Sequence, residues 1–178
     1  KCRTEKFHRL SLCNWVCAKI LVNIPIFFHN VVFLISYLFL FKYRSKPLFD
    51  WGTHVQSGHI KRITDPDIQA CVIEIMSPNV NTCYITHPDD PKQTLGIILA
   101  VIVLLVKNLK KQFSFEVTIL DDRGVKRRLR SSTYQPKTSV KTFICTMPLR
   151  LDDGWNTISC TLLDYPYRAF CTGYMETW

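Results

Sequence analysis

Alternation of apolar and polar residues is the clearest pattern in the second half of the chain. In residues 113–119 (FSFEVTI) every second residue is apolar, which is typical of a strand with one buried face. Residues 121–124 (DDRG) follow, and Asp and Gly favour a tight turn. Residues 125–130 (VKRRLR) then return from it, so the sequence predicts a β-hairpin. The solvent face of its second strand would carry Lys126, Arg128 and Arg130.

Other short apolar runs, separated by turn-rich connections, predict further strands at 70–76, 82–86, 140–146 and 155–163. The run 95–106 is too short to cross a bilayer, and it fits a buried strand or a core helix. Several short strands at this spacing indicate a mainly β chain. We expect residues 45–178 to form an antiparallel β-sandwich of jelly-roll type.

The first 44 residues have a different character. Residues 20–41 contain no Asp, Glu, Lys or Arg, and a helix of that length can span a bilayer. Asn23, Pro25 and His29 interrupt the stretch. Two interpretations stay open for residues 1–44: an N-terminal apolar segment, helical and able to anchor the chain in a membrane, or a stretch that is foreign to the native domain.

Composition and charge narrow the class of protein. Apolar residues make up 47% of the 178 residues, which is enough to build a core and excludes a fully disordered chain. Lys and Arg number 23 against 14 Asp and Glu, and the formal net charge is +9. A basic surface attracts acidic partners.

Catalytic and metal-binding motifs are missing from the sequence. It has no phosphate loop, nucleophile elbow or zincin helix. The eight cysteines form no C-x-x-C pair, and Cys71, Cys145 and Cys160 are expected to be small core residues in a reducing compartment. The pairs of neighbouring Asp residues sit beside Pro or Gly, as in ordinary turns. We therefore expect no catalytic residue, cofactor or metal.

A cluster of basic residues between positions 107 and 130 is the strongest functional signal. The basic residues flank one predicted strand, so a hairpin could bring them to one surface that binds an acidic partner. The alternative is a solvated strand face that discourages aggregation. Nucleic acid is not expected, because the aromatic residues of a single-strand platform are absent from this run. The candidate contacts are Lys107, Lys110, Lys111, Arg123, Lys126, Arg127, Arg128 and Arg130.

Several ordered segments carry a resemblance to a known family. They are residues 58–65 (GHIKRITD), 94–97 (TLGI), 107–111 (KNLKK), 115–117 (FEV), 143–148 (FICTMP) and 150–156 (RLDDGWN). Together they resemble the cilia- and flagella-associated protein 20 family, from about Ser45 to about Thr177. In that family further strands follow the position of Thr177, so we expect the sandwich domain to be C-terminally incomplete.

The resemblance implies a jelly-roll β-sandwich and a non-enzymatic protein of the ciliary axoneme. It places such a protein at the inner junction of doublet microtubules, where the B-tubule closes onto the A-tubule. There it would touch tubulin beside a parkin-coregulated-type protein and support the stability and motility of the cilium. It also implies presence at basal bodies and, as a further location, in the nucleus. Tubulin is acidic, so the basic cluster is compatible with this role.

Two other functions compete with this one. The first is a membrane-tethered β-sandwich interaction module, with residues 20–41 as its anchor. The second is a carbohydrate-binding sandwich or an enzyme, because jelly rolls host many unrelated functions. Trp51, Trp155 and Tyr165 could stack on sugar rings, although such residues more often fill cores.

Overall fold

The structure is a computed structural model of the chain. It describes residues 3–6, 24–26, 31–35, 51–79, 82–90, 93 and 101–177. The described residues are mainly strands, arranged in three sheets. The predicted mainly β fold with antiparallel sheets is therefore confirmed.

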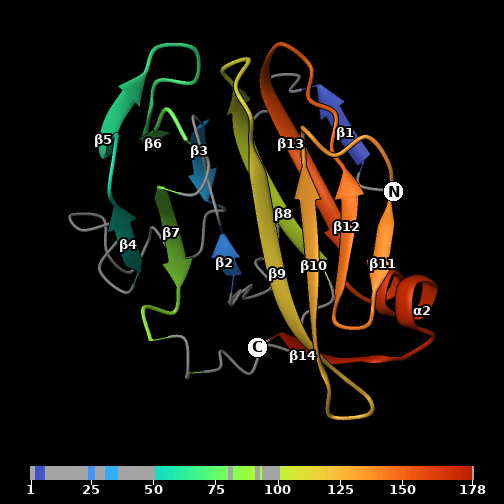
Figure 1. The fold of residues 1–178 in the computed structure, drawn as a ribbon. Coiled ribbons are helices and arrows are strands. Elements are labelled where there is room, and N and C mark those ends of the chain that lie inside the picture. Colours follow the sequence, from blue (N-terminus) through green and yellow to red (C-terminus); the bar gives the residue numbers. More distant parts are fainter. Residues whose placement is uncertain are drawn as a thin grey trace, which may run out of the picture.

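The six-stranded sheet forms one layer of the molecule (Figure 1). Its pairings are all antiparallel. In spatial order the strands are β1 (Arg3–Lys6), β13 (Gly154–Thr161), β8 (Val101–Asn108), β3 (Val31–Ile35), β6 (Ala70–Met76) and β5 (His59–Asp65).

Two smaller sheets form the opposite layer. In Figure 1, β2 lies beside β9, so these two sheets extend one another across the same side of the molecule. The five-stranded sheet has the order β11 (Ser139–Lys141), β12 (Ile144–Pro148), β10 (Lys126–Ser132), β9 (Ser114–Asp121) and β14 (Tyr174–Thr177). The three-stranded sheet has the order β2 (Ile24–Ile26), β7 (Cys83–His87) and β4 (Gly52–Val55).

One hydrophobic core lies between the two layers. Ile75, Val106 and Ile158 from the six-stranded sheet belong to the same buried cluster as Phe115 and Ile119 from β9. All five side chains are almost completely buried. Removing apolar area from water is the main favourable contribution to folding. The apolar side chains at alternate positions of residues 113–119 therefore pack the hairpin against this core.

The region 140–146 differs from its prediction as a single strand. The chain turns at Thr142 and Phe143, which separates β11 from β12 and makes them an antiparallel pair. β12 then runs parallel to β10, so this sheet is not wholly antiparallel. A seven-residue helix, α2 (Asp164–Phe170), follows β13 and was also not predicted.

The N-terminal segment is not helical where the structure describes it. β1, β2 and β3 are strands, and β3 lies between β8 and β6. The β-branched residues of the run VVFLI in β3 favour a strand, so the helical interpretation is wrong for these pieces. The rest of residues 1–44 lies outside the described residues. In the part of the chain that is described, no helix is long and apolar enough to cross a membrane.

Candidate functional site

The β9–β10 hairpin carries five of the eight candidate cations. Its pairing places Lys126 opposite Leu120, Arg128 opposite Thr118 and Arg130 opposite Glu116. Residues directly opposite each other share a face of the sheet. The side chains of Lys126, Arg128 and Arg130 therefore line the outer face, as predicted.

A single carboxylate holds two of these cations in place. Glu116 is almost fully buried, and its oxygens accept hydrogen bonds from Arg128 Nε at 2.7 Å and from Arg130 Nε at 2.8 Å. Charge-assisted bonds of this kind fix geometry as well as adding energy. The two guanidinium groups are thus positioned before any partner arrives, and they share the one negative charge of Glu116.

The turn of the hairpin is built around Asp121. Its Oδ1 accepts hydrogen bonds from the backbone N–H groups of Arg123 at 3.0 Å and Val125 at 2.7 Å. Gly124 has a φ of +70°, a conformation that glycine adopts without strain. The predicted turn chemistry is therefore confirmed, and it leaves Arg123 exposed at the tip of the hairpin.

Arg127 does not share the outer face. Its Nε donates to Asp121 Oδ2 at 2.8 Å, and its Nη1 donates to the carbonyl oxygen of Thr142. The guanidinium carbon also lies 4.8 Å from the ring centre of Phe170, a cation–π contact. Alternation along β10 puts Arg127 on the same side as buried Leu129. The inward position of Arg127 could therefore have been predicted from the alternation of the sequence.

The Arg127–Asp121 pair lowers the pKa of Asp121. Burial opposes ionisation of Asp121, but the hydrogen bonds from Arg127 and from two backbone N–H groups outweigh it and hold the pKa of Asp121 below its ordinary value. Arg127 thus neutralises an internal charge and braces the turn. We leave it out of the candidate surface.

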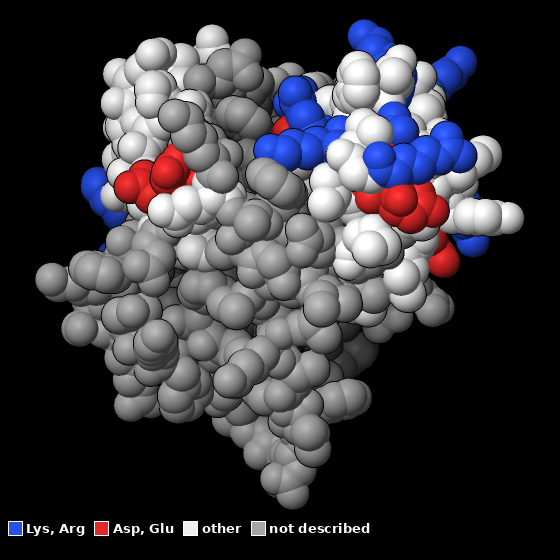
Figure 2. Space-filling view, turned by 90° about the horizontal axis from the view of Figure 1, so that it is seen from below, with Lys and Arg blue, Asp and Glu red and all other residues white. Residues whose placement is uncertain are grey.

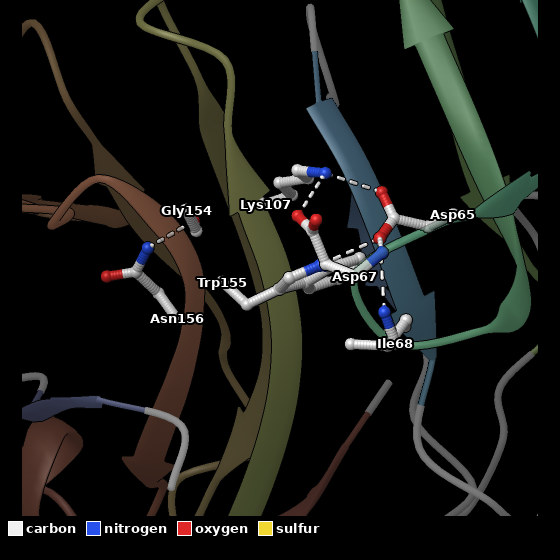
Figure 3. A network of polar contacts seen from close by, with 7 residues as sticks. All are labelled: Asp65, Asp67, Ile68, Lys107, Gly154, Trp155 and Asn156. Atoms are coloured by element: carbon white, nitrogen blue, oxygen red, sulfur yellow. Dashed lines mark hydrogen bonds and ion pairs between the residues drawn. The ribbon is translucent and has the colours of Figure 1, made fainter. Parts of the chain in front are cut away.

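Lys107 is likewise part of an internal network, shown in Figure 3. Its Nζ lies 2.6 Å from Asp65 Oδ2 and 2.7 Å from Asp67 Oδ2. The indole Nε1 of Trp155 donates to Asp65 Oδ1 at 3.2 Å, and the backbone N–H of Ile68 donates to the same oxygen at 3.4 Å. The network ties the β5–β6 turn to β8 and β13 on the outer side of the six-stranded sheet.

Asp65 and Lys107 stabilise each other's charged form, and the pKa values of both residues are shifted. Burial opposes the charged form of Asp65, but bonds from Lys107, Trp155 and the Asp67 backbone lower the pKa of Asp65. Burial likewise opposes the charge on Lys107, yet Asp65 and Asp67 raise the pKa of Lys107. Lys107 therefore stabilises the fold, and it is not one of the residues that could contact a partner.

Lys110 and Lys111 lie at the other end of the hairpin from its turn. β9 has eight residues, which at about 3.3 Å per residue separates its two ends by roughly 26 Å. Lys110 pairs with Asp153 at 3.3 Å, both side chains being exposed, whereas Lys111 lines a groove with Gly58, Met76 and Ser77. The eight candidates therefore do not form one surface.

What remains is a surface that we call the hairpin face: Arg123, Lys126, Arg128 and Arg130. The nearby carboxylates of the hairpin are Glu116 and the exposed Asp122, and β14 places Glu176 in register with Leu120 and Lys126, so the four cations still outnumber these three acidic residues. Figure 2 looks at the end of the molecule where the hairpin turn lies and shows Lys and Arg side chains gathered around a smaller acidic group. The charge and position of the hairpin face suit binding to an acidic surface.

Lys141 is a cation that the sequence analysis missed. β11 pairs with β12 so that Lys141 is opposite Ile144, and Ile144 is opposite Arg128. Lys141 thus extends the outer face of the hairpin to the edge of the sheet. Its position depends on the turn at Thr142 and Phe143, which the pattern of residues 140–146 did not reveal.

The structure also locates the residues considered for sugar stacking and for metal binding. Trp51, Trp155 and Tyr165 are each at least 91% buried, so a role in stacking on sugars is not supported. Among the described residues, no group of His, Cys, Asp and Glu is placed to hold a metal ion.

The cysteines divide into buried and exposed ones. Cys145 and Cys160 are buried as predicted, and burial raises the pKa of the Cys145 thiol. Cys71 is exposed, contrary to prediction; it shares a face of β6 with the buried Ile73 and Ile75, but it lies at the start of the strand, next to the β5–β6 turn. Hydrogen bonds from Thr64 and Arg62 lower the pKa of the Cys71 thiol.

Comparison with known proteins gives a consistent result. The model of the CFA20 domain matches residues 34–178. A Paramecium tetraurelia protein named Cilia- and flagella-associated protein 20 is 57% identical over 138 residues, which is 78% of this chain and 72% of that protein. Its namesake from Chlamydomonas reinhardtii is 59% identical over 138 residues, 78% of this chain and 73% of the relative. The namesake from Caenorhabditis briggsae is 51% identical over 150 residues, covering 84% and 74%.

Proposed function

Because this chain belongs to the CFA20-domain family, we propose that it is a non-enzymatic structural protein of the cilium that binds microtubules through the hairpin face. Association with cilia rests on the names of the three relatives described above. The finer location is the inner junction, where the protein joins the B-tubule to the A-tubule beside a parkin-coregulated-type protein. This part rests on the family resemblance, as do roles in the stability and motility of the cilium and presence at the basal body.

The observation that carries the microtubule proposal is the prepositioned charge of the hairpin face. Arg128 and Arg130 are held by Glu116, while Lys126 and Arg123 are exposed. A rigid face loses little conformational entropy when it meets an acidic surface. Binding needs no chemical step: surface complementarity and opposite charge suffice, and added salt weakens the attraction.

A co-pelleting assay with the full chain and purified microtubules tests the proposal. The double variant Arg123→Glu/Lys126→Glu reverses two exposed charges and leaves the Glu116 cluster intact. We expect its affinity for microtubules to fall at least about tenfold, and the affinity of the unchanged chain to fall with rising salt.

Lys61→Glu/Arg62→Glu is the matched control. It makes the same change in net charge on exposed positions of β5, the edge strand of the other layer. We expect its affinity to stay within about twofold of the unchanged chain, because rim charges away from a contact contribute little. Equal losses in both double variants, or binding that salt does not alter, would contradict the assignment of the hairpin face.

A further inference from the structure

The outer edge of β11 is a surface that the proposed function does not use. β11 is the terminal strand of its sheet and pairs with β12, and within the described part of the chain no strand pairs with its other side. Its three residues are all exposed. An open strand edge presents backbone N–H and C=O groups that an extended segment of another protein can pair with.

The chemistry around this edge is strongly cationic. Residues 123–150, which supply β10, β11 and β12, contain eight Lys and Arg residues and no Asp or Glu; three of the eight, Arg127, Arg128 and Arg130, pair with carboxylates of β9. Lys137 and Lys141 are exposed, and no carboxylate of the described residues is within ion-pair distance of either. Lys141 continues the cross-strand row of Arg128 and Ile144 on the outer face. A segment added here would meet positive charge on that face.

The other side of the same edge is apolar. Val140 is opposite the buried Cys145, so it belongs to the core-facing row, yet it is 50% exposed. Phe143, in the turn that follows, is 60% exposed, and its ring centre lies 6.0 Å from the guanidinium carbon of Arg127. Helix α2 lies near the same end of β11 (Figure 1), and its Phe170 contacts the same guanidinium group of Arg127 at 4.8 Å.

We propose that β11 accepts an extended segment of a partner protein as an additional antiparallel or parallel strand. Side chains of a strand alternate between faces, so one acidic residue of the segment lies opposite Lys141 and another, two positions along, lies opposite Ser139 on the same face of β11. The apolar residue between them packs on Val140 and Phe143. The partner segment is therefore recognised by acidic residues at alternate positions with apolar residues between them. The inference goes beyond the proposed function, since it concerns a peptide and a strand edge outside the hairpin face.

A second copy of this chain and a purely protective role both fit the β11 edge less well than an acidic segment does. A second copy would bring two cationic edges together, and like charges directly opposite each other are unfavourable. A purely protective edge needs a charge such as Lys141 to prevent aggregation. Such an edge gains nothing from exposing Val140 and Phe143 beside that charge.

A binding assay with synthetic peptides tests the proposal on the full chain. The probe is a fluorescein-labelled heptapeptide in which Glu alternates with Val, and fluorescence anisotropy reports its affinity. A peptide of the same composition with its Glu residues grouped separates strand addition from simple charge attraction, and a peptide with Lys in place of Glu reverses the charge. We expect the alternating peptide to bind at least about fivefold more tightly than the grouped one and the Lys peptide not to saturate.

Two variants locate the site. We expect Lys141→Glu and Val140→Asp each to weaken binding of the alternating peptide about tenfold. Val55→Asp is the matched control, since Val55 is a 49% exposed valine at the end of another edge strand. Hydrogen exchange should show new protection of the amides of residues 139–143 when the peptide binds. Protection elsewhere alone, or equal affinity for the alternating and grouped peptides, would overturn the inference.

The same variants keep this test apart from the microtubule test. Lys141→Glu and Val140→Asp leave Arg123 and Lys126 unchanged. Loss of peptide binding with microtubule binding retained supports two separate surfaces. If the unchanged chain binds microtubules but no peptide, the inference about β11 fails and the proposed function stands.

Discussion

Lys107 on β8 and Asp65 at the end of β5 form an ion pair of 2.6 Å, although β3 and β6 lie between their strands in the sheet. The Asp65 side chain is only 3% exposed and that of Lys107 only 20%. Trp155 Nε1 reaches the same carboxylate from β13. The pair therefore fastens the β5–β6 turn to the middle of the six-stranded sheet, and removing one partner leaves the other charge poorly solvated.

Lys107→Met is predicted to destabilise the protein by about 3 kcal/mol, because it leaves Asp65 as an unpaired buried carboxylate. Urea unfolding followed by tryptophan fluorescence measures the loss. Lys110→Met is the control: Lys110 and its partner Asp153 are 74% and 77% exposed, and such a pair contributes below about 1 kcal/mol. Equal effects of the two substitutions would show that the Asp65 network does not support the fold.

Stability should depend on pH through the buried carboxylates. The pKa values of Asp65 and Asp121 are lowered in the folded protein from the ordinary value of 3.8. Below that value the unfolded chain binds more protons than the folded one, so stability is lost as the pH falls through the folded pKa values. We expect the free energy of unfolding to decrease from about pH 4 downward.

Asp65→Asn isolates one contribution to this pH dependence. The variant should be less stable at pH 7, since Lys107 loses its buried partner, and its free energy of unfolding should fall less steeply below about pH 4. Urea titrations at pH 7, 4 and 3 measure both effects. An unchanged acid slope would mean that Asp65 titrates alike in the folded and unfolded states.

Gly58 is predicted to be indispensable to the β4–β5 connection. Its φ is +104°, and a Cβ at this position would overlap the carbonyl oxygen of Met76. Gly58→Ala combines backbone strain with a collision against backbone, so we expect a loss above about 3 kcal/mol. Gly124→Ala is the control: its φ is +70° with no atom within 4 Å of the added Cβ, and it should cost only about 1 kcal/mol. Thermal unfolding compares the two; similar losses would contradict the steric argument.

The hairpin was predictable because its determinants are close together in the sequence. Alternation in residues 113–119 and the turn residues 121–124 act over a few positions, and the structure forms β9, the turn and β10 there. Strand β6 agrees with its predicted range of 70–76. Local pattern and local turn chemistry fix such elements whatever the rest of the chain does.

Long-range relationships were not predictable from the same patterns. Lys107 is 42 residues from Asp65, and Trp155 is 90 residues from it, so nothing local marks Lys107 as an internal residue. The parallel pairing of β12 with β10 depends on where the chain returns after β11. Charge alone therefore overestimated the candidate surface. The fold determines which cations are neutralised and which remain at the surface.

Arg127 provides the sharpest test of that distinction. Its side chain is only 11% exposed, and Asp121, its partner, is fully buried. Arg127→Met should destabilise the protein by about 3–5 kcal/mol, because Asp121 is left as a buried charge without its cation. Arg123→Met, in the same hairpin, should change stability by less than about 0.5 kcal/mol, as is usual for exposed positions. Urea unfolding measures both substitutions.

The two arginine variants should also differ in microtubule binding: the variant that is expected to keep its stability, Arg123→Met, should lose affinity, and the destabilised variant, Arg127→Met, should keep it. At a temperature where both variants are folded, Arg123→Met is expected to weaken microtubule binding about threefold through loss of one exposed charge. Arg127→Met should retain the affinity of the unchanged chain, because its guanidinium is occupied by Asp121, Thr142 and Phe170. If Arg127→Met lost binding while folded and Arg123→Met did not, the contact would involve the inner side of β10 and not the hairpin face. The role of each arginine thus follows from the side of the strand on which it lies.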